Sequence, residues 1–460
     1  MSENKRSSFS GSIGFVLAAA GSAVGLGNIW RFPYLAAKDG GGLFIIIYLI
    51  LSVTFGFTLI ITEVAIGRKT KKGPLSAYKS LHKKSGFLGF LVTIVPMIIL
   101  PYYCAIGGWV IKYFVGFITG QGISMAEDGY FTGFITSTAE PLIYMFIFLG
   151  ICALIILQGV VKGIEKLSKF LMPIILVVII AIFSLTLSHT DPDGTTRTGL
   201  DGLKILFIPD FSNVTPGSFL SVLVDAMGQL FYSLSVAMGI MVAYGSYVKD
   251  DENISKSVGR IEIFDTIIAI LAGVMIIPAV YSFMGADGLS ASGPGLMFIY
   301  LPKVFAAMGS WGNIIGVIFF AMVLFAAITS AISILEAIVS SFMDEFHISR
   351  NKATIIETII AGAVAIVVCL GYNVWYFEAV LPNGTTGQVL DILDYVSNNI
   401  LMPIVAIITC ILIGWILGPK TIINEVEKMS RTKLYVVMIK FIAPILLAIL
   451  FLKAIGLIMI

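Results

Sequence analysis

Long apolar runs separated by short polar loops make up most of this 460-residue chain. A bilayer core about 30 Å thick requires roughly 20 apolar residues in each helix that crosses it. By that measure the pattern predicts about eleven membrane-spanning helices. Their predicted ranges are 12–37, 42–67, 87–119, 140–159, 166–187, 215–246, 259–284, 310–343, 354–372, 392–417 and 436–458.

Composition indicates the same class, an all-α integral membrane protein. Hydrophobic residues make up 58% of the chain and charged residues only 12%, which excludes an ordinary soluble protein. A formal charge of +2 is too balanced for a nucleic-acid binder. The histidines and cysteines show no metal-ligand spacing, and no set of catalytic residues is evident. We therefore predict that the chain is not an enzyme. Its oligomeric state is left open.

Loop charges predict the orientation, because positively charged loops stay on the cytoplasmic side of a membrane. Of the 29 Lys and Arg residues, 21 fall in one set of loops and five in the other. The other three, Arg31, Lys112 and Lys440, lie within predicted spans. We expect a multi-pass protein of the cell membrane with its N-terminus in the cytoplasm and its C-terminus outside.

A polar external stretch divides the spans into two groups of five, and the odd number requires the second group to be inverted. The predicted organisation has six parts. They are a cytoplasmic segment at 1–11, a first five-helix repeat at 12–187, an extracellular connector at 188–214, a second, inverted repeat at 215–417, a cytoplasmic loop at 418–435 and an additional eleventh helix at 436–460.

Small and polar residues interrupt the first span at 21–28 and the sixth at 232–239. Interruptions at corresponding positions of two halves are typical of a transporter binding site at the membrane midplane. Unwound backbone there needs partners. The N–H groups of Leu26 and Gly27 would suit a carboxylate, and the freed carbonyls before them a cation. The alternative is that Gly21 and Gly25 form an ordinary small-residue face for helix packing.

Charged side chains within the spans are functional hypotheses by default. Asp265 lies near the start of the seventh span, where a buried carboxylate needs a cation or a proton. Arg31 and Asp394 lie at comparable depths near the outer side. They are consistent with an ion pair that opens and closes as an external gate, or with a static structural bridge.

Two adjacent hydroxyls, Thr329 and Ser330, lie among apolar residues of the eighth span. Such side chains commonly donate to carbonyls of the preceding helical turn. They could equally join the free carbonyls of the first span in an all-oxygen cage for Na⁺, since hard cations prefer oxygen ligands. The residues alone do not choose between these interpretations.

Four motifs together closely resemble the neurotransmitter:sodium symporter family. They are GSAVGLGNIWRFP at 21–33, YY at 102–103, GQLFYSLS at 228–235 and AAITS at 326–330. The resemblance runs from about Phe9 to the end of the chain. It implies the LeuT-type fold, alternating access, and sodium-coupled import of an amino acid that supplies its own carboxylate.

The resemblance also implies which residues bind. One Na⁺ site would use Ala23, Asn28, Ser233 and Asp265 together with the substrate carboxylate. The second would use Gly21, Val24, Ala326, Thr329 and Ser330. The substrate would contact Ala23, Leu26, Gly27, Ile99, Tyr103, Tyr232, Ser233, Ser235, Met238, Ser330 and Ile334.

Two gates follow from the same resemblance. The outer gate would be Arg31 with Asp394, capped by Tyr103 and Tyr232. The inner gate would pair Arg6 with Asp344 near Tyr247. Phe9 stands where many members of the family have tryptophan.

Departures from the family pattern refine the prediction. Gly25 stands where amine-transporting members carry an acidic residue, so the substrate should be an amino acid. Asp265 stands where chloride-dependent members carry asparagine, so chloride is not expected as a co-substrate. Met238, a flexible thioether in place of an aromatic residue, favours hydrophobic or aromatic amino acids such as tyrosine, tryptophan and leucine. A non-transporting amino-acid sensor and a proton-coupled transporter remain alternatives.

Overall fold

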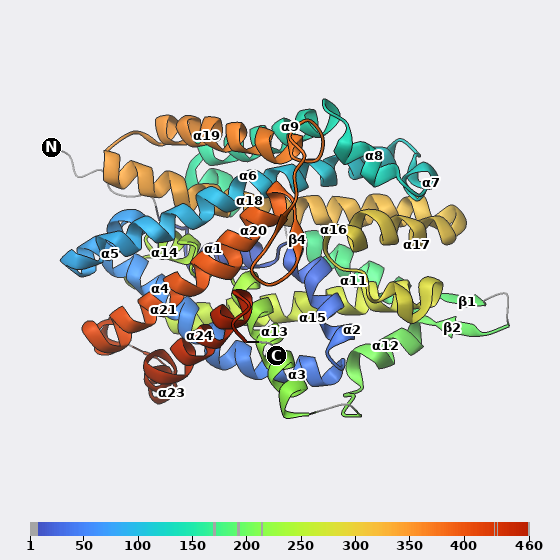
Figure 1. The fold of residues 1–460 in the computed structure, drawn as a ribbon. Coiled ribbons are helices and arrows are strands. Elements are labelled where there is room, and N and C mark those ends of the chain that lie inside the picture. Colours follow the sequence, from blue (N-terminus) through green and yellow to red (C-terminus); the bar gives the residue numbers. More distant parts are fainter. Residues whose placement is uncertain are drawn as a thin grey trace.

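The computed structural model describes residues 8–168, 172–190, 194–212, 215–426, 428–429 and 431–458. In that part of the chain, helices lie side by side in one elongated bundle with two short β-hairpins at its surface (Figure 1). Eight described helices are long and apolar enough to cross a membrane, and a pair bent by 52° between Ser12 and Lys38 makes a ninth. The predicted all-α membrane architecture is confirmed.

The first half contains five predicted spans, with short helices in the loops. We use α for α-helices and η for 3₁₀- and π-helical turns. Its elements are α1 (Ser12–Ala23), η1 (Gly27–Arg31), α2 (Phe32–Lys38), α3 (Gly42–Leu51), η2 (Ser52–Gly56), α4 (Phe57–Thr70), α5 (Pro74–Leu81), η3 (Lys83–Ser85), α6 (Gly86–Ile118), α7 (Gly122–Met125), α8 (Tyr130–Thr136), α9 (Glu140–Leu157), η4 (Val160–Glu165), α10 (Lys166–Ser168) and α11 (Met172–Leu185).

The rest of the chain contains the connector, the second half and the last helix. Its elements are β1 (Ser188–Thr190), β2 (Thr196–Thr198), α12 (Gly199–Phe207), α13 (Pro216–Ser233), α14 (Ile240–Gly245), α15 (Ile254–Gly288), α16 (Gly293–Gly295), η5 (Leu296–Tyr300), α17 (Leu301–Ala307), η6 (Gly309–Trp311), α18 (Gly312–Phe346), α19 (Arg350–Leu370), β3 (Ala379–Val380), β4 (Thr386–Gly387), α20 (Val389–Asp394), η7 (Tyr395–Leu401), α21 (Met402–Ile411), η8 (Leu412–Ile416), α22 (Lys420–Val426), α23 (Thr432–Val437), η9 (Met438–Ile442) and α24 (Ala443–Ala454).

Each of the eleven predicted spans is occupied by helix. The fifth and sixth are shorter pieces, α10 with α11 and α13 with α14, so they are not among the long helices counted above. The connector has structure that hydropathy did not predict. Its β1–β2 hairpin leads into α12, whose first turn is capped by Thr198 and Asp201 in a reciprocal capping box.

Two glycines hold α14 directly against α4. A Cβ on Gly67 would lie 2.0 Å from the Val242 carbonyl oxygen, and a Cβ on Gly245 would lie 2.2 Å from that of Val64. The two backbones are therefore in contact, as small residues permit in membrane proteins. This contact fixes the position of α14, which is the second piece of the broken sixth span, and so helps to position the break before it.

Candidate functional site

The first span breaks where its regular hydrogen bonds are redirected. In a continuous α-helix the Gly25 N–H would bond to the Gly21 carbonyl, but it donates to the Ala23 carbonyl at 2.9 Å. Asn28 likewise donates its N–H to Gly25, at 3.2 Å, instead of Val24. The carbonyls of Gly21 and Val24 thereby lose their regular helical partners.

The sixth span breaks between α13 and α14, over residues 234–239. Ser235 and Ala237 take positive φ angles of 53° and 63°, which are unusual for residues with a side chain. Glu63 of α4 holds this stretch in place, because its carboxylate accepts a hydrogen bond from the Ala237 N–H at 2.6 Å. Both predicted interruptions are thus true breaks in their helices.

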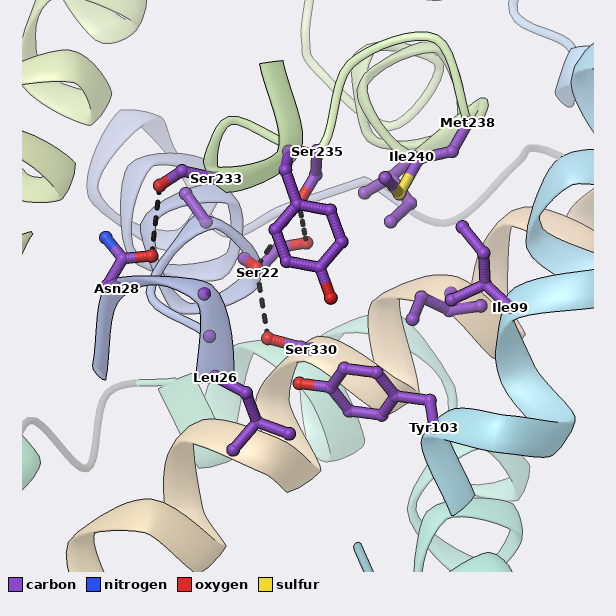
Figure 2. A pocket seen from close by; sticks show the side chains of 15 residues that line it. Ser22, Leu26, Asn28, Ile99, Tyr103, Ser233, Ser235, Met238, Ile240 and Ser330 are labelled. Carbon is purple, nitrogen blue, oxygen red and sulfur yellow. Dashed lines mark hydrogen bonds between the residues drawn. The ribbon is translucent and has the colours of Figure 1, made fainter. Parts of the chain in front are cut away.

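A cavity of about 30 Å³ lies between the two breaks, α6 and α18 (Figure 2). All eleven residues predicted to contact the substrate line it. Four further lining residues, Ser22, Gly25, Asn28 and Ile240, complete the wall. A space of this size holds only roughly two or three water molecules, so we expect the surrounding side chains to move apart when an amino acid binds.

Next to the cavity lies a cluster of buried oxygen atoms around Asp265. Its carboxylate accepts hydrogen bonds from Asn28 at 2.8 Å, from Ser233 at 2.5 Å and from Tyr48 at 3.0 Å. Ser233 also reaches the Asn28 side-chain oxygen at 3.0 Å. Asp265 is fully buried and forms no ion pair with any described residue. The three side chains predicted for the first Na⁺ site are therefore in direct contact.

A second group of oxygen atoms lies where α1 meets α18. The Thr329 hydroxyl donates to the carbonyls of Phe325 and Ala326, both at 3.0 Å, as the structural interpretation of this residue expected. Ser330 instead crosses to the Ser22 carbonyl at 3.1 Å. Gly21 faces Thr329, since a Cβ there would lie 3.6 Å from the Thr329 Cβ. The structural interpretation therefore holds for Thr329, while Ser330 reaches a carbonyl of the first span and the predicted Na⁺ cage stays a prediction.

The Tyr103 hydroxyl points into the cavity (Figure 2). It lies close to the Leu26 N–H and the Ser330 hydroxyl, yet it is buried without a well-formed hydrogen bond to any described residue. Buried hydroxyls normally have a partner. Gly25 leaves the space open, because a Cβ there would lie 2.9 Å from the Ser330 hydroxyl oxygen. These groups could together bind a carboxylate.

The predicted outer ion pair is not formed in this structure. Within the described part of the chain, no ion pair joins Arg31 to Asp394, and Asp394 instead accepts a hydrogen bond from Asn398 at 2.6 Å. Arg31 lines a second cavity, of about 760 Å³, together with Asp225 and Lys453. A gate formed by Arg31 and Asp394 stays a prediction for another state of the molecule.

The predicted inner gate is described only in part. Arg6 lies outside the described residues. Asp344 accepts a hydrogen bond from the Gly73 N–H at 2.5 Å. Tyr247 donates to Glu336 at 2.5 Å, and its carbonyl accepts the Phe9 N–H at 3.1 Å. Phe9 is buried against the Tyr247 ring at 6.2 Å, so it packs at this position despite its smaller ring.

Arg350 forms a bidentate ion pair with Glu336, at 2.5 and 2.9 Å, that sequence reasoning missed. The Glu336 side chain is fully buried. We predict that Glu336→Ala destabilises the folded protein by about 3 kcal/mol, because it leaves a guanidinium that is only 16% exposed without its carboxylate. Thermal unfolding of the purified protein measures this.

The matched control is Glu345→Ala on the same helix, whose contact with Lys79 at 3.7 Å is partly exposed. It should cost less than about 1 kcal/mol. Equal melting temperatures for the two variants would contradict a structural role for the Glu336 pair.

Two polar residues close to the cavity were also missed. Tyr48 donates to Asp265, and Gln229 donates to the Gly27 carbonyl at 3.2 Å. Gln229 belongs to a recognised motif, but nothing in its spacing indicated a partner. Tyr48 is a lone hydroxyl in an apolar run, and only the packing of α3 against the sixth and seventh spans shows what it contacts.

Comparison with known proteins agrees with this geometry. The profile of the Sodium:neurotransmitter symporter family matches residues 6–123 and 132–458. The sodium-dependent transporter YhdH of Bacillus subtilis is 33% identical, over 99% of both chains. The sodium- and chloride-dependent GABA transporter 2 of Homo sapiens is 25% identical, over 90% of this chain and 74% of its own.

A solved structure is similar over its whole length. The crystal structure of MhsT in complex with L-phenylalanine superposes with a TM-score of 0.85 and 34% sequence identity, covering 98% of this chain and 100% of that one. Profile, relatives and fold agree, so the chain belongs to the sodium:neurotransmitter symporter family and is a sodium-dependent membrane transporter, not an enzyme.

Proposed function

We propose that this transporter imports hydrophobic or aromatic L-amino acids together with sodium, by alternating access and without chloride. The observation that carries the proposal is the placement of Asp265. A fully buried carboxylate with no basic partner among the described residues lies beside a cavity. A buried carboxylate of this kind needs a cation or a proton, and the surrounding oxygen atoms suit Na⁺.

The oxygen atoms in these two regions could serve as ligands for two Na⁺ ions. The first is the cluster of Asn28, Ser233 and Asp265 with the Ala23 carbonyl, and a substrate carboxylate in the cavity would complete it. The second joins the carbonyls freed by the break in α1 to Ala326, Thr329 and Ser330 on α18. If the substrate completes a sodium shell, each must raise the affinity of the other.

The proposed substrate class rests on the two ends of the cavity. One end presents the Tyr103 hydroxyl and the break in the first span, which suit the carboxylate of an amino acid. The other end is apolar, with Ile99, Met238 and Ile334 all nearly fully buried. MhsT, with a similar fold, binds L-phenylalanine. A zwitterion with a large apolar side chain fits both ends.

The carboxylate of Asp265 supports the proposed independence from chloride. Relatives such as the human GABA transporter 2 are chloride-dependent, whereas here the Asp265 carboxylate is already held by three hydrogen bonds beside the proposed sodium site. An ionised carboxylate at this position can balance Na⁺ without an added anion. We also keep the orientation inferred from loop charge, with the N-terminus in the cytoplasm.

A binding experiment tests the substrate class. We expect purified protein to bind labelled phenylalanine, tyrosine, tryptophan or leucine only when sodium is present. Glutamate and lysine should compete at least about 100-fold more weakly, because a charged side chain in an apolar pocket costs several kcal/mol. Equal competition by glutamate or lysine would contradict the proposed substrate class.

A further inference from the structure

The helix formed by α23, η9 and α24 is the most exposed of the long apolar helices. Only 28% of its apolar stretch is buried, against 39–72% for the other seven. It lies at the edge of the bundle beside α21 (Figure 1). Its outward surface therefore faces lipid in the membrane, where a charged side chain without a partner is energetically costly.

Lys440 lies in this helix, about 12 Å along the axis from Thr432 at 1.5 Å per residue. Its ammonium group lies 5.4 Å from the centre of the Trp415 ring and forms no ion pair or hydrogen bond with any described residue. A lysine at membrane depth is costly unless it reaches the headgroup level or an anion.

Lys440 and Trp415 are held together by the backbone. The Trp415 ring N–H donates to the Lys440 carbonyl at 3.1 Å. Gly414 allows this approach, because a Cβ there would lie 3.0 Å from the Ile439 carbonyl oxygen. The two π-helical turns η8 and η9 meet at this point, and such widened turns recur at functional sites. The pair is therefore positioned by the fold.

Aromatic rings form one wall around the ammonium group. Trp415 and Phe441 pack edge to face at 5.4 Å, and their exposed fractions are 58% and 49%. Tryptophan is enriched at the level of lipid headgroups. Trp415 is next to the last residue of η8, where the span ends. The exposed face therefore combines apolar rings for acyl chains with a cation that has no acidic partner among the described residues.

The adjoining loop adds positive charge. Lys420 at the start of α22, Lys428 after it and Lys433 at the start of α23 are exposed, while Glu425 is paired with Arg68 at 2.7 Å. Arg431 already has partners, since it donates to the Val53 carbonyl at 2.8 Å and lies 4.0 Å from the Glu262 carboxylate. Among the described residues of this region, Lys440 is the cation that lies within the apolar helix and is open to lipid.

We propose that Lys440 and Trp415 form a binding site for the phosphate headgroup of an anionic phospholipid. The ammonium group supplies positive charge and hydrogen-bond donors to the phosphate. The rings of Trp415 and Phe441 contact the part of the acyl chain next to the headgroup. This site lies outside the transport cavity and does not depend on which amino acid is carried.

Native mass spectrometry of the full-length purified protein with phosphatidylglycerol or phosphatidylcholine tests the site. We expect the wild type to prefer phosphatidylglycerol, and Lys440→Gln to bind it about fivefold more weakly, as for the loss of one lysine at an anionic surface. Lys440→Arg should retain the preference. Inorganic phosphate should not displace the bound lipid.

Lys433→Gln is the matched control, since it removes an exposed cation seven positions away in the same segment. It should leave phosphatidylglycerol binding within about twofold of the wild type. Equal binding of the two lipids by the wild type, or an unchanged affinity in Lys440→Gln, would overturn the proposal. Lys440 would then only extend its ammonium group to the aqueous interface. Displacement of the lipid by inorganic phosphate would also overturn it, because the site would then bind free anions.

Discussion

Asp265→Asn should abolish sodium-driven uptake in chloride-free medium and make the remaining uptake depend on chloride. The substitution keeps the shape of the side chain but removes the negative charge from the proposed sodium site. Losing one partner of a buried charge pair costs about 3–5 kcal/mol, so sodium-dependent uptake should fall roughly 100-fold or more. Initial rates in proteoliposomes, with chloride or gluconate outside, measure the effect.

Asp287→Asn is the matched control for that experiment. It makes the same chemical change on the same helix, α15, but at an exposed position near the opposite end. We expect its uptake to match that of the wild type with either anion. If Asp265→Asn transports equally well with and without chloride, the carboxylate is not the charge that balances sodium.

Tyr103→Phe should weaken substrate binding with little effect on folding. The hydroxyl is buried in the cavity without a well-formed hydrogen bond to the described residues, so its removal leaves no protein group unsatisfied. A hydrogen bond to a charged group contributes about 1.5–3 kcal/mol, which corresponds to a roughly 10- to 100-fold increase in KM. Concentration dependence of sodium-driven uptake gives this value.

Tyr113→Phe provides the comparison on the same helix, α6. Its hydroxyl donates to the Phe298 carbonyl at 2.8 Å, away from the cavity. This variant should lose some stability and keep the KM of the wild type. A KM for Tyr103→Phe within twofold of the wild type would mean that the tyrosine does not contact the substrate carboxylate.

Much of the fold was predictable, because crossing a bilayer constrains both length and composition. The apolar runs located every span, and the small residues at 21–28 and 232–239 marked both breaks. Hydropathy carries no such constraint outside the membrane. The β1–β2 hairpin and α12 in the connector were therefore missed, although Thr198 and Asp201 form a helix-start signal.

The cavity residues were predictable from motifs, whereas many of their side-chain partners were not. A contact between distant spans depends on how each helix is rotated, and apolar composition does not specify rotation. The sequence therefore gives no sign that Tyr48 donates to Asp265. Nor does it indicate that Arg350, at the start of α19, pairs with the buried Glu336.

The predicted outer gate illustrates a second reason for incomplete prediction. A contact that opened and closed would exist in only part of a transport cycle, and one structure shows one arrangement. Here Asp394 accepts a hydrogen bond from Asn398, while Arg31 lines the cavity of about 760 Å³. Sequence identifies residues capable of pairing, but the energy difference between two arrangements of one chain is too small to follow from residue types.

Uptake into proteoliposomes tests the central claim most directly. Labelled phenylalanine, tyrosine, tryptophan and leucine would be supplied outside, with an inward sodium gradient, with choline replacing sodium, or with gluconate replacing chloride. We predict accumulation above equilibrium for at least one of these amino acids, abolished by choline and unchanged by gluconate. Sodium-dependent binding without accumulation, or accumulation that persists in choline, would contradict sodium-coupled amino-acid symport.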